Sequence, residues 1–446
     1  MAEISVKRLP KDPGPAAWNR LLPEPEAAKP LERYVKADWM VIGAGFAGLS
    51  AARRLAENCA GDRIVVLEAS RIGDGPAGRN SGFMIDLPHD LSSDNYRGTL
   101  EKDRDRTQDN RMAIDYAQSM VEDFGLPDEA FRRSGKINAA ATEAGDAHNR
   151  SYAAHLDALG EPCRMMEARE MSDLTGIHYY QSGLYTPGTA MIQPAMYIRG
   201  LGKGLASNRL SLHEASPVTG LTRNGAWVAQ TPKGRVTAPK VILAVNGHLN
   251  SFGFAQGRLM HVFTYASMTR SLTADEVTRL GGAPDWGVTP ADPMGTTVRR
   301  ISGAGGDRIV VRNRFTFDPS LEVDDGRLAR VSRDHDAAFA ARFPMLKGVE
   351  MAYRWGGRLC VSLNDVQVVG EVEEGLYSSC CQNGLGTVRG TLAGILAADL
   401  ASGRSSAALD RALAEPAPKR LPPMPIARVG AALRLRWKER RAGREL

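Results

Sequence analysis

The stretch that decides the fold is Trp39-Met-Val-Ile-Gly-Ala-Gly-Phe-Ala-Gly-Leu-Ser-Ala-Ala-Arg-Arg-Leu55. Its apolar start is typical of a buried parallel strand, and an Ala- and Leu-rich helical pattern follows the three glycines. Gly43 permits the tight turn, Gly45 lets the backbone approach a pyrophosphate, and Gly48 lets helix and strand pack closely. The free N–H groups at the helix N-terminus favour an anion, so the turn is predicted to hold phosphates.

A second apolar run supports a dinucleotide-binding unit. Arg63-Ile-Val-Val-Leu67 ends in Glu68, the acidic residue expected ~20 residues after the glycines to bind ribose hydroxyls. A glycine-rich strand end alone could be a simple turn. The order strand, turn, helix, strand and acidic residue favours a βαβ unit over residues 37–70. This order leaves open which dinucleotide the unit binds.

Length and charge limit the function classes. A chain of 446 residues has room for about three average domains, although nucleotide-binding folds commonly interleave two. The net charge is +6, but residues 428–446 carry seven Lys or Arg and two Glu, so the rest of the chain is nearly neutral. A basic nucleic-acid groove along the body is therefore not expected.

Cysteine usage and the N-terminus predict a cytoplasmic protein. Five cysteines without a CxxC pair fit a reducing compartment. The N-terminus has no apolar signal core, and no run approaches the ~20 apolar residues of a membrane span. Its prolines predict an extended lead-in over the surface for residues 1–36. His148 and His155 show no metal-ligand spacing, so no metal site is expected.

The loop after Glu68 carries a resemblance to a family. Leu67-Glu-Ala-Ser-Arg-Ile-Gly-Asp-Gly-Pro-Ala-Gly-Arg-Asn-Ser-Gly82 resembles the loop that runs along the flavin in FAD-dependent amine and amino-acid oxidases of the D-amino-acid, glycine and sarcosine oxidase superfamily. The Gly-Arg-Asn version is most similar to the γ-glutamylputrescine oxidase branch. The resemblance extends from Ala37 to Gly403. Pro76 stands where the family often has a small residue, and no proline lies near Gln367, where the family typically has one.

A second glycine turn, around Gly384 and Gly386, precedes a long helical pattern that starts near Thr387. By the resemblance, this helix directs its N-terminus at the flavin N1/C2=O edge, where negative charge collects on reduction. This favours flavin over nicotinamide. Asn246-Gly247 could form a simple hairpin turn, but its place after the buried strand 240–245 favours a position beside the cofactor.

The resemblance implies an α/β fold. A Rossmann-like FAD-binding domain, with a parallel sheet and a β-meander, is interleaved with a substrate domain built on an antiparallel sheet. The expected divisions are a lead-in (1–36), the FAD-binding domain (37–95, 183–255 and 352–415), the substrate domain (96–182 and 256–351), and a Pro-rich linker with a basic C-terminal helix (416–446). Alternating patterns predict strands over 262–269, 295–301 and 307–317, which would form a floor under the flavin.

The residues expected to contact FAD, largely by resemblance, surround the two turns and the flavin loop. They are Gly43, Gly45, Phe46, Ala47, Gly48, Glu68, Ala69, Ser70, Arg71, Gly78, Arg79, Asn80, Ser81, Gly82, Val218, Asn246, Gly247, Trp355, Gly357, Asn383, Gly384, Leu385, Gly386 and Thr387. Some sarcosine oxidases attach FAD through a cysteine, but its counterpart here is nearer Gly357 than Cys360. Noncovalent FAD is therefore expected, with Cys360, Cys380 and Cys381 as buried strand residues.

The predicted activity is an FAD-dependent oxidase of a primary or secondary amine or an N-substituted amino acid, such as γ-glutamylputrescine, sarcosine or iminodiacetate. Hydride passes from the carbon next to nitrogen to flavin N5, the imine hydrolyses, and dioxygen yields hydrogen peroxide. Candidates for substrate alignment are Tyr265, His261, Arg299 and Arg312. A solvated sheet face is an equally good interpretation of the arginines unless one points inward to bind a carboxylate.

Two alternatives keep the flavin. The first is a dehydrogenase that passes electrons to a quinone or an electron-transfer protein. The second is an RNA-directed flavoprotein, which the near-neutral body disfavours. The basic segment 428–444 is predicted to form a helix that packs on the surface, with membrane or RNA docking as the less favoured interpretation.

Overall fold

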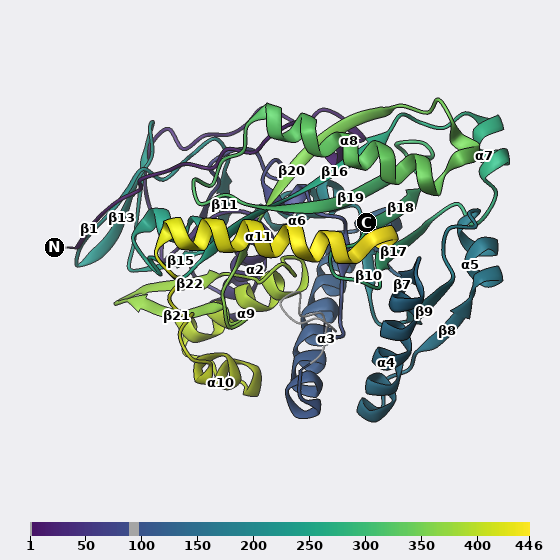
Figure 1. Cartoon of the computed structure of the whole chain (residues 1–446). Helices are drawn as coiled ribbons and strands as arrows, with labels where there is room; N and C mark the ends of the chain where they lie inside the picture. Colours follow the sequence, from purple (N-terminus) through teal and green to yellow (C-terminus); the bar gives the residue numbers. More distant parts are fainter. Residues whose placement is uncertain (1, 89–97) are drawn as a thin grey trace.

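The computed structural model describes residues 2–88 and 98–446 (Figure 1). Its central sheet has six strands in the order β11-β4-β3-β15-β22-β21. These are β3 (Trp39–Ile42), β4 (Ile64–Leu67), β11 (Leu210–His213), β15 (Lys240–Leu243), β21 (Val368–Glu373) and β22 (Leu376–Cys380). All pairs are parallel except the edge pair β21–β22. Every residue of β3 and β4 is buried, as expected of parallel strands covered on both faces.

Two parallel helices cover one face of this sheet. α2 (Phe46–Asn58) and α9 (Val388–Ser402) each follow one of the predicted glycine turns. They lie so close that a Cβ on Gly394 would stand 2.1 Å from the Ala47 carbonyl oxygen. Small residues therefore set the spacing of the two helices, and α3 (Leu100–Asp123) and α6 (Pro194–Leu205) complete the layer.

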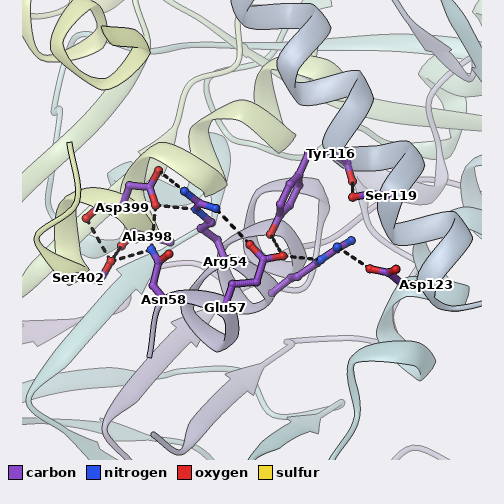
Figure 2. Close-up of polar contacts among 10 residues, drawn as sticks. Arg54, Glu57, Asn58, Tyr116, Ser119, Asp123, Ala398, Asp399 and Ser402 are labelled. Atoms are coloured by element: carbon purple, nitrogen blue, oxygen red, sulfur yellow. Dashed lines mark hydrogen bonds and ion pairs between the residues drawn. The ribbon is translucent and has the colours of Figure 1, made fainter. Parts of the chain in front are cut away.

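Figure 2 shows how polar groups fix the far ends of these helices. Arg54 Nε donates to Asp399 Oδ1 at 2.6 Å, and Asn58 Nδ2 donates to the same oxygen at 2.8 Å. Tyr116 of α3 donates to Glu57 Oε1 at 3.2 Å. Because these contacts hold α2 and α9 in parallel, the N-termini of both helices face the same side of the molecule.

A second sheet covers the other face of the parallel sheet. The predicted meander is present as β12 (Gly220–Asn224), β13 (Ala226–Gln230) and β14 (Arg235–Ala238). Strands β1 (Ala2–Ser5) and β2 (Tyr34–Lys36) extend it at its two edges, in the order β1-β12-β13-β14-β2. The fully buried Trp227 lies in the apolar core between these two sheets.

Residues 3–36 of the lead-in lie mostly at the surface, as predicted, but the segment is not extended throughout. Besides β1 and β2 it contains α1 (Ala17–Arg20), whose Trp18 is fully buried. Trp18 packs with Met268 and Trp355, and its indole Nε1 donates to the Asn80 carbonyl at 2.9 Å. The prolines restrict the backbone as expected, but they do not prevent the strand pairing and burial between them.

The third layer is an eight-stranded sheet, ordered β20-β16-β19-β18-β17-β7-β9-β8. Its strands are β7 (Lys136–Ala140), β8 (Arg164–Glu167), β9 (Ser182–Thr186), β16 (Met260–Thr269), β17 (Trp286–Pro290), β18 (Thr297–Ile301), β19 (Arg308–Phe317) and β20 (Met351–Val361). All neighbours are antiparallel except β17 and β7. The mixed α/β fold and the antiparallel sheet are therefore as predicted.

Strand pairing moves two of the expected domain limits. β9 pairs with β7, and β20 pairs with β16. Residues 183–186 and 352–361 therefore belong to the large sheet, although they were predicted in the FAD-binding domain. Hydrogen bonds to strands far away in the sequence decide which sheet a strand joins, so the local sequence pattern could not place these residues. The predicted limit between residues 95 and 96 lies outside the described residues.

The remaining elements surround these layers. They are β5 (Phe83–Met84), β6 (Phe131–Arg133) and β10 (Ala190–Ile192), which form a small sheet, and α4 (Glu143–Leu159), α5 (Ala168–Thr175), α7 (Ala274–Leu280), α8 (Asp325–Arg342), α10 (Ala407–Ala414) and α11 (Met424–Ala442). The last helix crosses the front of the molecule in Figure 1. Within the described residues, no helix is long and apolar enough to span a bilayer.

Candidate functional site

A cavity of about 270 Å³ lies where the N-termini of α2 and α9 meet the large sheet. Most residues that were predicted to contact a dinucleotide line it. They are Gly43, Gly45, Phe46, Ala47, Glu68, Ala69, Ser70, Arg71, Asn80, Ser81, Val218, Asn246, Gly247, Gly384, Leu385, Gly386 and Thr387. The two glycine turns, 341 residues apart in the sequence from Gly43 to Gly384, thus border one continuous space.

The first turn is built for close backbone approach. Gly43 has a φ of +102°, and a Cβ there would lie 2.6 Å from the Ala244 carbonyl oxygen. A Cβ on Gly48 would lie 1.7 Å from the Gly43 carbonyl oxygen, so only glycine fits. Gly48 lies behind the turn rather than on the cavity wall. Among the described side chains none caps α2 at Gly45, so its first N–H groups are available to an anion.

Glu68 binds the backbone of this turn with its carboxylate. Its Oε2 accepts from the Ala44 N–H at 2.9 Å, and its Oε1 accepts from the Ser70 N–H at 3.0 Å. Burial raises the pKa of Glu68, and the two backbone donors act in the opposite direction. The carboxylate lines the cavity at the end of β4, the place where the βαβ pattern puts a ribose-binding acid.

The second turn presents backbone in the same way. Asn383 and Gly384 have φ values of +50° and +85°, and α9 begins directly after Thr387 with no described side chain capping it. Thr387 Oγ1 donates to the Phe83 carbonyl at 2.7 Å. Asn383 turns away and its Oδ1 accepts from the Ser362 N–H at 2.8 Å, so it supports the turn without lining the cavity.

The flavin-loop residues divide into a cavity side and a rear side. Asn80 and Ser81 line the cavity. Arg79 points away, and its Nη1 donates to the Pro13 and Gly356 carbonyls at 3.0 and 3.2 Å. Trp355 Nε1 donates to the Arg79 carbonyl at 2.9 Å. Gly78, Arg79, Gly82, Trp355 and Gly357 were predicted as cofactor contacts, but they do not line the cavity. Gly78 lies against the Gly73 backbone, and Gly82 lies against the Arg299 side chain and the Ile192 carbonyl.

Only Arg312 of the four predicted substrate residues lines the cavity. Tyr265 packs with Phe263 and Leu328 under α8, and its hydroxyl bonds to Thr316. His261 lies beneath Gly247, where its Nε2 bonds to Asn250 Oδ1 at 2.9 Å, and burial lowers its pKa to about 4. The prediction that Tyr265 and His261 contact substrate is not supported, because alternation along β16 turns both side chains away.

Arg299 is a buried support for the flavin loop. Its Nη1 donates to the Ile192 carbonyl at 2.8 Å and to the Ser81 carbonyl at 3.1 Å. Its guanidinium lies over the rings of Trp18 and Phe83. Desolvation lowers its pKa to about 10. All these contacts are to the loop and its neighbours, so a substrate-binding role for Arg299 is not supported.

Several cavity residues were missed by the sequence reasoning. Thr297 pairs across β18–β19 with Arg312, and Thr289 of the next strand lies beside them. Arg358 also lines the cavity, and it forms a bidentate ion pair with Asp12 in which both N–O distances are 3.0 Å. Burial, and next the charge of Arg358, lower the pKa of the neighbouring His248 to about 3. The antiparallel pattern could have indicated Thr297, but the contact with Asp12 has no local signal.

Comparison with known proteins agrees with this geometry. A model of the DAO family, described as "FAD dependent oxidoreductase", matches residues 38–400. The chain belongs to the DAO family. It is therefore an FAD-dependent oxidoreductase, as the resemblance of the loop at residues 67–82 implied.

Individual relatives of this DAO-family chain are distant. Gamma-glutamylputrescine oxidoreductase of Escherichia coli is 26% identical over 359 residues, which is 78% of this chain and 79% of that protein. The probable oxidoreductase OrdL of Haemophilus influenzae is 24% identical over 366 residues, with 78% and 79% covered. Glycine oxidase from Geobacillus kaustophilus has a similar structure, with a TM-score of 0.67 at 19% identity over 84% of this chain and 96% of that one.

The cavity suits the cofactor of the DAO family. It offers the N-termini of α2 and α9, which no described side chain caps, and the Glu68 carboxylate, which two backbone N–H groups hold at the end of β4. Cys360 lines the cavity, but its thiol is fully buried and its pKa lies well above the ordinary value, with a hydrogen bond to Cys381 as the largest cause and burial next. A thiol in this state is a poor nucleophile, so noncovalent FAD stays the prediction.

Proposed function

We propose that this enzyme oxidises the carbon next to nitrogen in a primary or secondary amine or an N-substituted amino acid. Bound FAD would accept a hydride from that carbon. The imine then reacts with water to give an aldehyde or oxo acid and the smaller amine, while dioxygen is reduced to hydrogen peroxide. The similarity to gamma-glutamylputrescine oxidoreductase supports an amine as substrate.

The observation that carries the proposal is the position of Arg312. Its side chain lines the same cavity as the N-terminus of α9, on a wall it shares with Thr289 and Thr297. A guanidinium beside the Thr297 hydroxyl suits a carboxylate, whereas the Thr289 hydroxyl already donates to Asn138 Oδ1 at 2.7 Å. This wall would hold the acidic end of the substrate and so set which carbon faces the cofactor.

The chain supplies positioning more than acid–base chemistry. His248 on the cavity wall and His261 beneath Gly247 are held neutral at pH 7 because their pKa values lie near 3 and 4. The N-terminus of α9 presents backbone N–H groups to the cavity. Oriented donors of this kind stabilise negative charge that develops on reduction. We propose that this electrostatic arrangement accounts for most of the rate.

The test is reduction of the FAD-loaded enzyme without oxygen. γ-Glutamylputrescine, sarcosine, glycine, iminodiacetate and proline would each be added, and loss of the oxidised flavin absorbance followed. At least one is expected to bleach the flavin. If none does, an amine substrate is excluded for this set and the proposal fails. With a substrate that bleaches the flavin, the ratio of hydrogen peroxide formed to substrate consumed would distinguish the two candidate activities. A ratio near one indicates an oxidase, and a ratio near zero indicates a dehydrogenase that uses a quinone or an electron-transfer protein.

Replacement of Arg312 tests the carboxylate site. Arg312→Leu is expected to raise KM for an acidic substrate by about 10- to 150-fold, since a charged hydrogen bond contributes about 1.5–3 kcal/mol, and to leave KM for a neutral amine nearly unchanged. Arg330→Leu, at an exposed position of α8, is the matched control. Equal effects on acidic and neutral amines would show that Arg312 does not bind a carboxylate.

A further inference from the structure

Helix α11 (Met424–Ala442) is fixed to the body at its C-terminal end. Arg314 of β19 forms an ion pair with Glu439 at 2.8 Å. Just beyond the helix, the Glu445 carboxylate accepts from the Ala141 and Thr142 N–H groups at 2.8 and 3.0 Å. These contacts set the rotation of the helix about its axis, so one of its faces is turned to solvent across the front of the molecule (Figure 1).

The solvent-facing side of α11 carries an apolar ridge. Ile426, Val429, Leu433 and Trp437 are 65%, 61%, 62% and 55% exposed. Their spacing of three, four and four residues places them on one face of the helix, and at 1.5 Å per residue the ridge is about 16 Å long. The side that meets the body carries three alanines, at positions 427, 431 and 442, together with Leu435, Lys438 and Glu439.

Positive charge borders the C-terminal part of this ridge. Exposed arginines stand beside it at positions 434, 436, 440 and 441, and the Arg441 guanidinium lies 5.2 Å from the Trp437 ring centroid. The acidic residues at this end, Glu439 and Glu445, are both turned inward and engaged by the body. The outer face of α11 therefore combines large apolar side chains with charge of one sign.

We propose that the outer face of α11 binds the surface of a bilayer that contains anionic lipids. The helix would lie in the plane of the interface, with the ridge among the upper acyl chains and the arginines at the phosphates. Trp437 suits this depth because an indole has an apolar body and a polar N–H. The inference concerns a surface outside the cavity and does not depend on which amine is oxidised.

A bilayer fits this face better than a protein does. A second copy docked through the same helix would bring its arginines against these, and like charges repel. A different protein would need an apolar groove with acidic residues on both rims. An anionic bilayer supplies apolar chains and phosphates along the full length of the ridge.

The experiment is sedimentation of the FAD-loaded enzyme with vesicles of phosphatidylglycerol and phosphatidylcholine, compared with vesicles of phosphatidylcholine alone. Binding is expected only with the anionic lipid and is expected to weaken as salt rises. Leu433→Ser combined with Trp437→Ser should weaken binding at least tenfold. Arg434→Gln combined with Arg440→Gln should weaken it at least threefold and flatten the salt dependence.

Met112→Ser, at a 37% exposed position of α3, is the matched control and should bind as the parent does. All variants should keep the parent flavin absorbance, since none of these side chains lines the cavity. The proposal is overturned if the parent enzyme does not bind anionic vesicles, or if the Leu433 and Trp437 double variant binds them as well as the parent does. It is also overturned if that variant converts a dimer to a monomer, because the ridge would then be a subunit interface.

Discussion

Arg54 Nε lies 2.6 Å from Asp399 Oδ1 and Arg54 Nη2 lies 3.2 Å from Asp399 Oδ2, which ties α2 to α9 at the ends away from the cavity. Asp399 is only 3% exposed. The pair is 345 residues apart in the sequence, and it keeps parallel the two helices whose N-termini border the cavity. Its loss would affect both stability and the alignment of the two turns.

Arg54→Gln is expected to lower the free energy of unfolding by about 1–3 kcal/mol. The change leaves a buried carboxylate whose remaining side-chain donor among the described residues is Asn58, and uncompensated buried charge is costly. Urea denaturation would measure the effect. Arg150→Gln removes an exposed pair with Asp146 and should change stability by less than about 0.5 kcal/mol. Equal effects of the two variants would show that the Arg54 pair does not hold the helices.

Gly48→Ala should reduce FAD affinity at least tenfold. A Cβ at this position would lie 1.7 Å from the Gly43 carbonyl oxygen, so the first turn would have to move away from the cavity. Equilibrium titration of the apoprotein with FAD, followed by flavin fluorescence, gives the dissociation constant. Gly61→Ala, where the added Cβ meets nothing within 4 Å, should bind FAD as the parent does. Unchanged affinity in both variants would contradict the assignment of this turn.

Arg299→Met should lower the melting temperature and FAD retention but leave KM for the substrate within about threefold. The change removes the donor to the Ser81 and Ile192 carbonyls, and unsatisfied buried acceptors cost about 1–3 kcal/mol each. Arg312→Leu should give the reverse pattern, with higher KM and little change in melting temperature. A large KM increase in the Arg299 variant that still holds FAD would restore the original prediction that Arg299 contacts substrate.

Lys136→Met should stabilise the protein at pH 7 by about 2–3 kcal/mol. Burial lowers the pKa of Lys136 to about 8, below its value of about 10.4 in the unfolded chain. The fold therefore disfavours the ammonium, and stability is reduced below pH 8 and regained as pH rises towards 10. Asn138 Oδ1 keeps its bond from Thr289 at 2.7 Å, so the variant leaves no acceptor unpaired there.

Urea denaturation at pH 7 and pH 10 would test the Lys136 prediction, with the stabilisation expected to be small at pH 10. Lys347→Met, at an exposed position, is the control and should show neither effect. A stabilisation of Lys136→Met that does not change between the two pH values would mean that the charge is not its cause.

Local sequence determined the two turns that border the cavity. At Gly43, Gly48 and Gly384 a side chain is excluded by the backbone conformation or by backbone a few residues away, and such sterics act over a few residues. The buried apolar strands and the meander also follow from patterns that are visible in single segments. A dinucleotide site could therefore be predicted from local sequence, whereas FAD itself was implied by the family resemblance of residues 67–82, and the family match agrees with it.

Only the tertiary structure decided which side chains face the cavity. Arg312 and Arg299 have similar strand contexts, yet Arg312 lines the cavity and Arg299 is enclosed by the Ser81 and Ile192 carbonyls. Trp18 reaches the loop at Asn80 from a segment that looked like a surface tail. These outcomes depend on sheet order and on contacts between segments many residues apart, and no local propensity encodes such pairing.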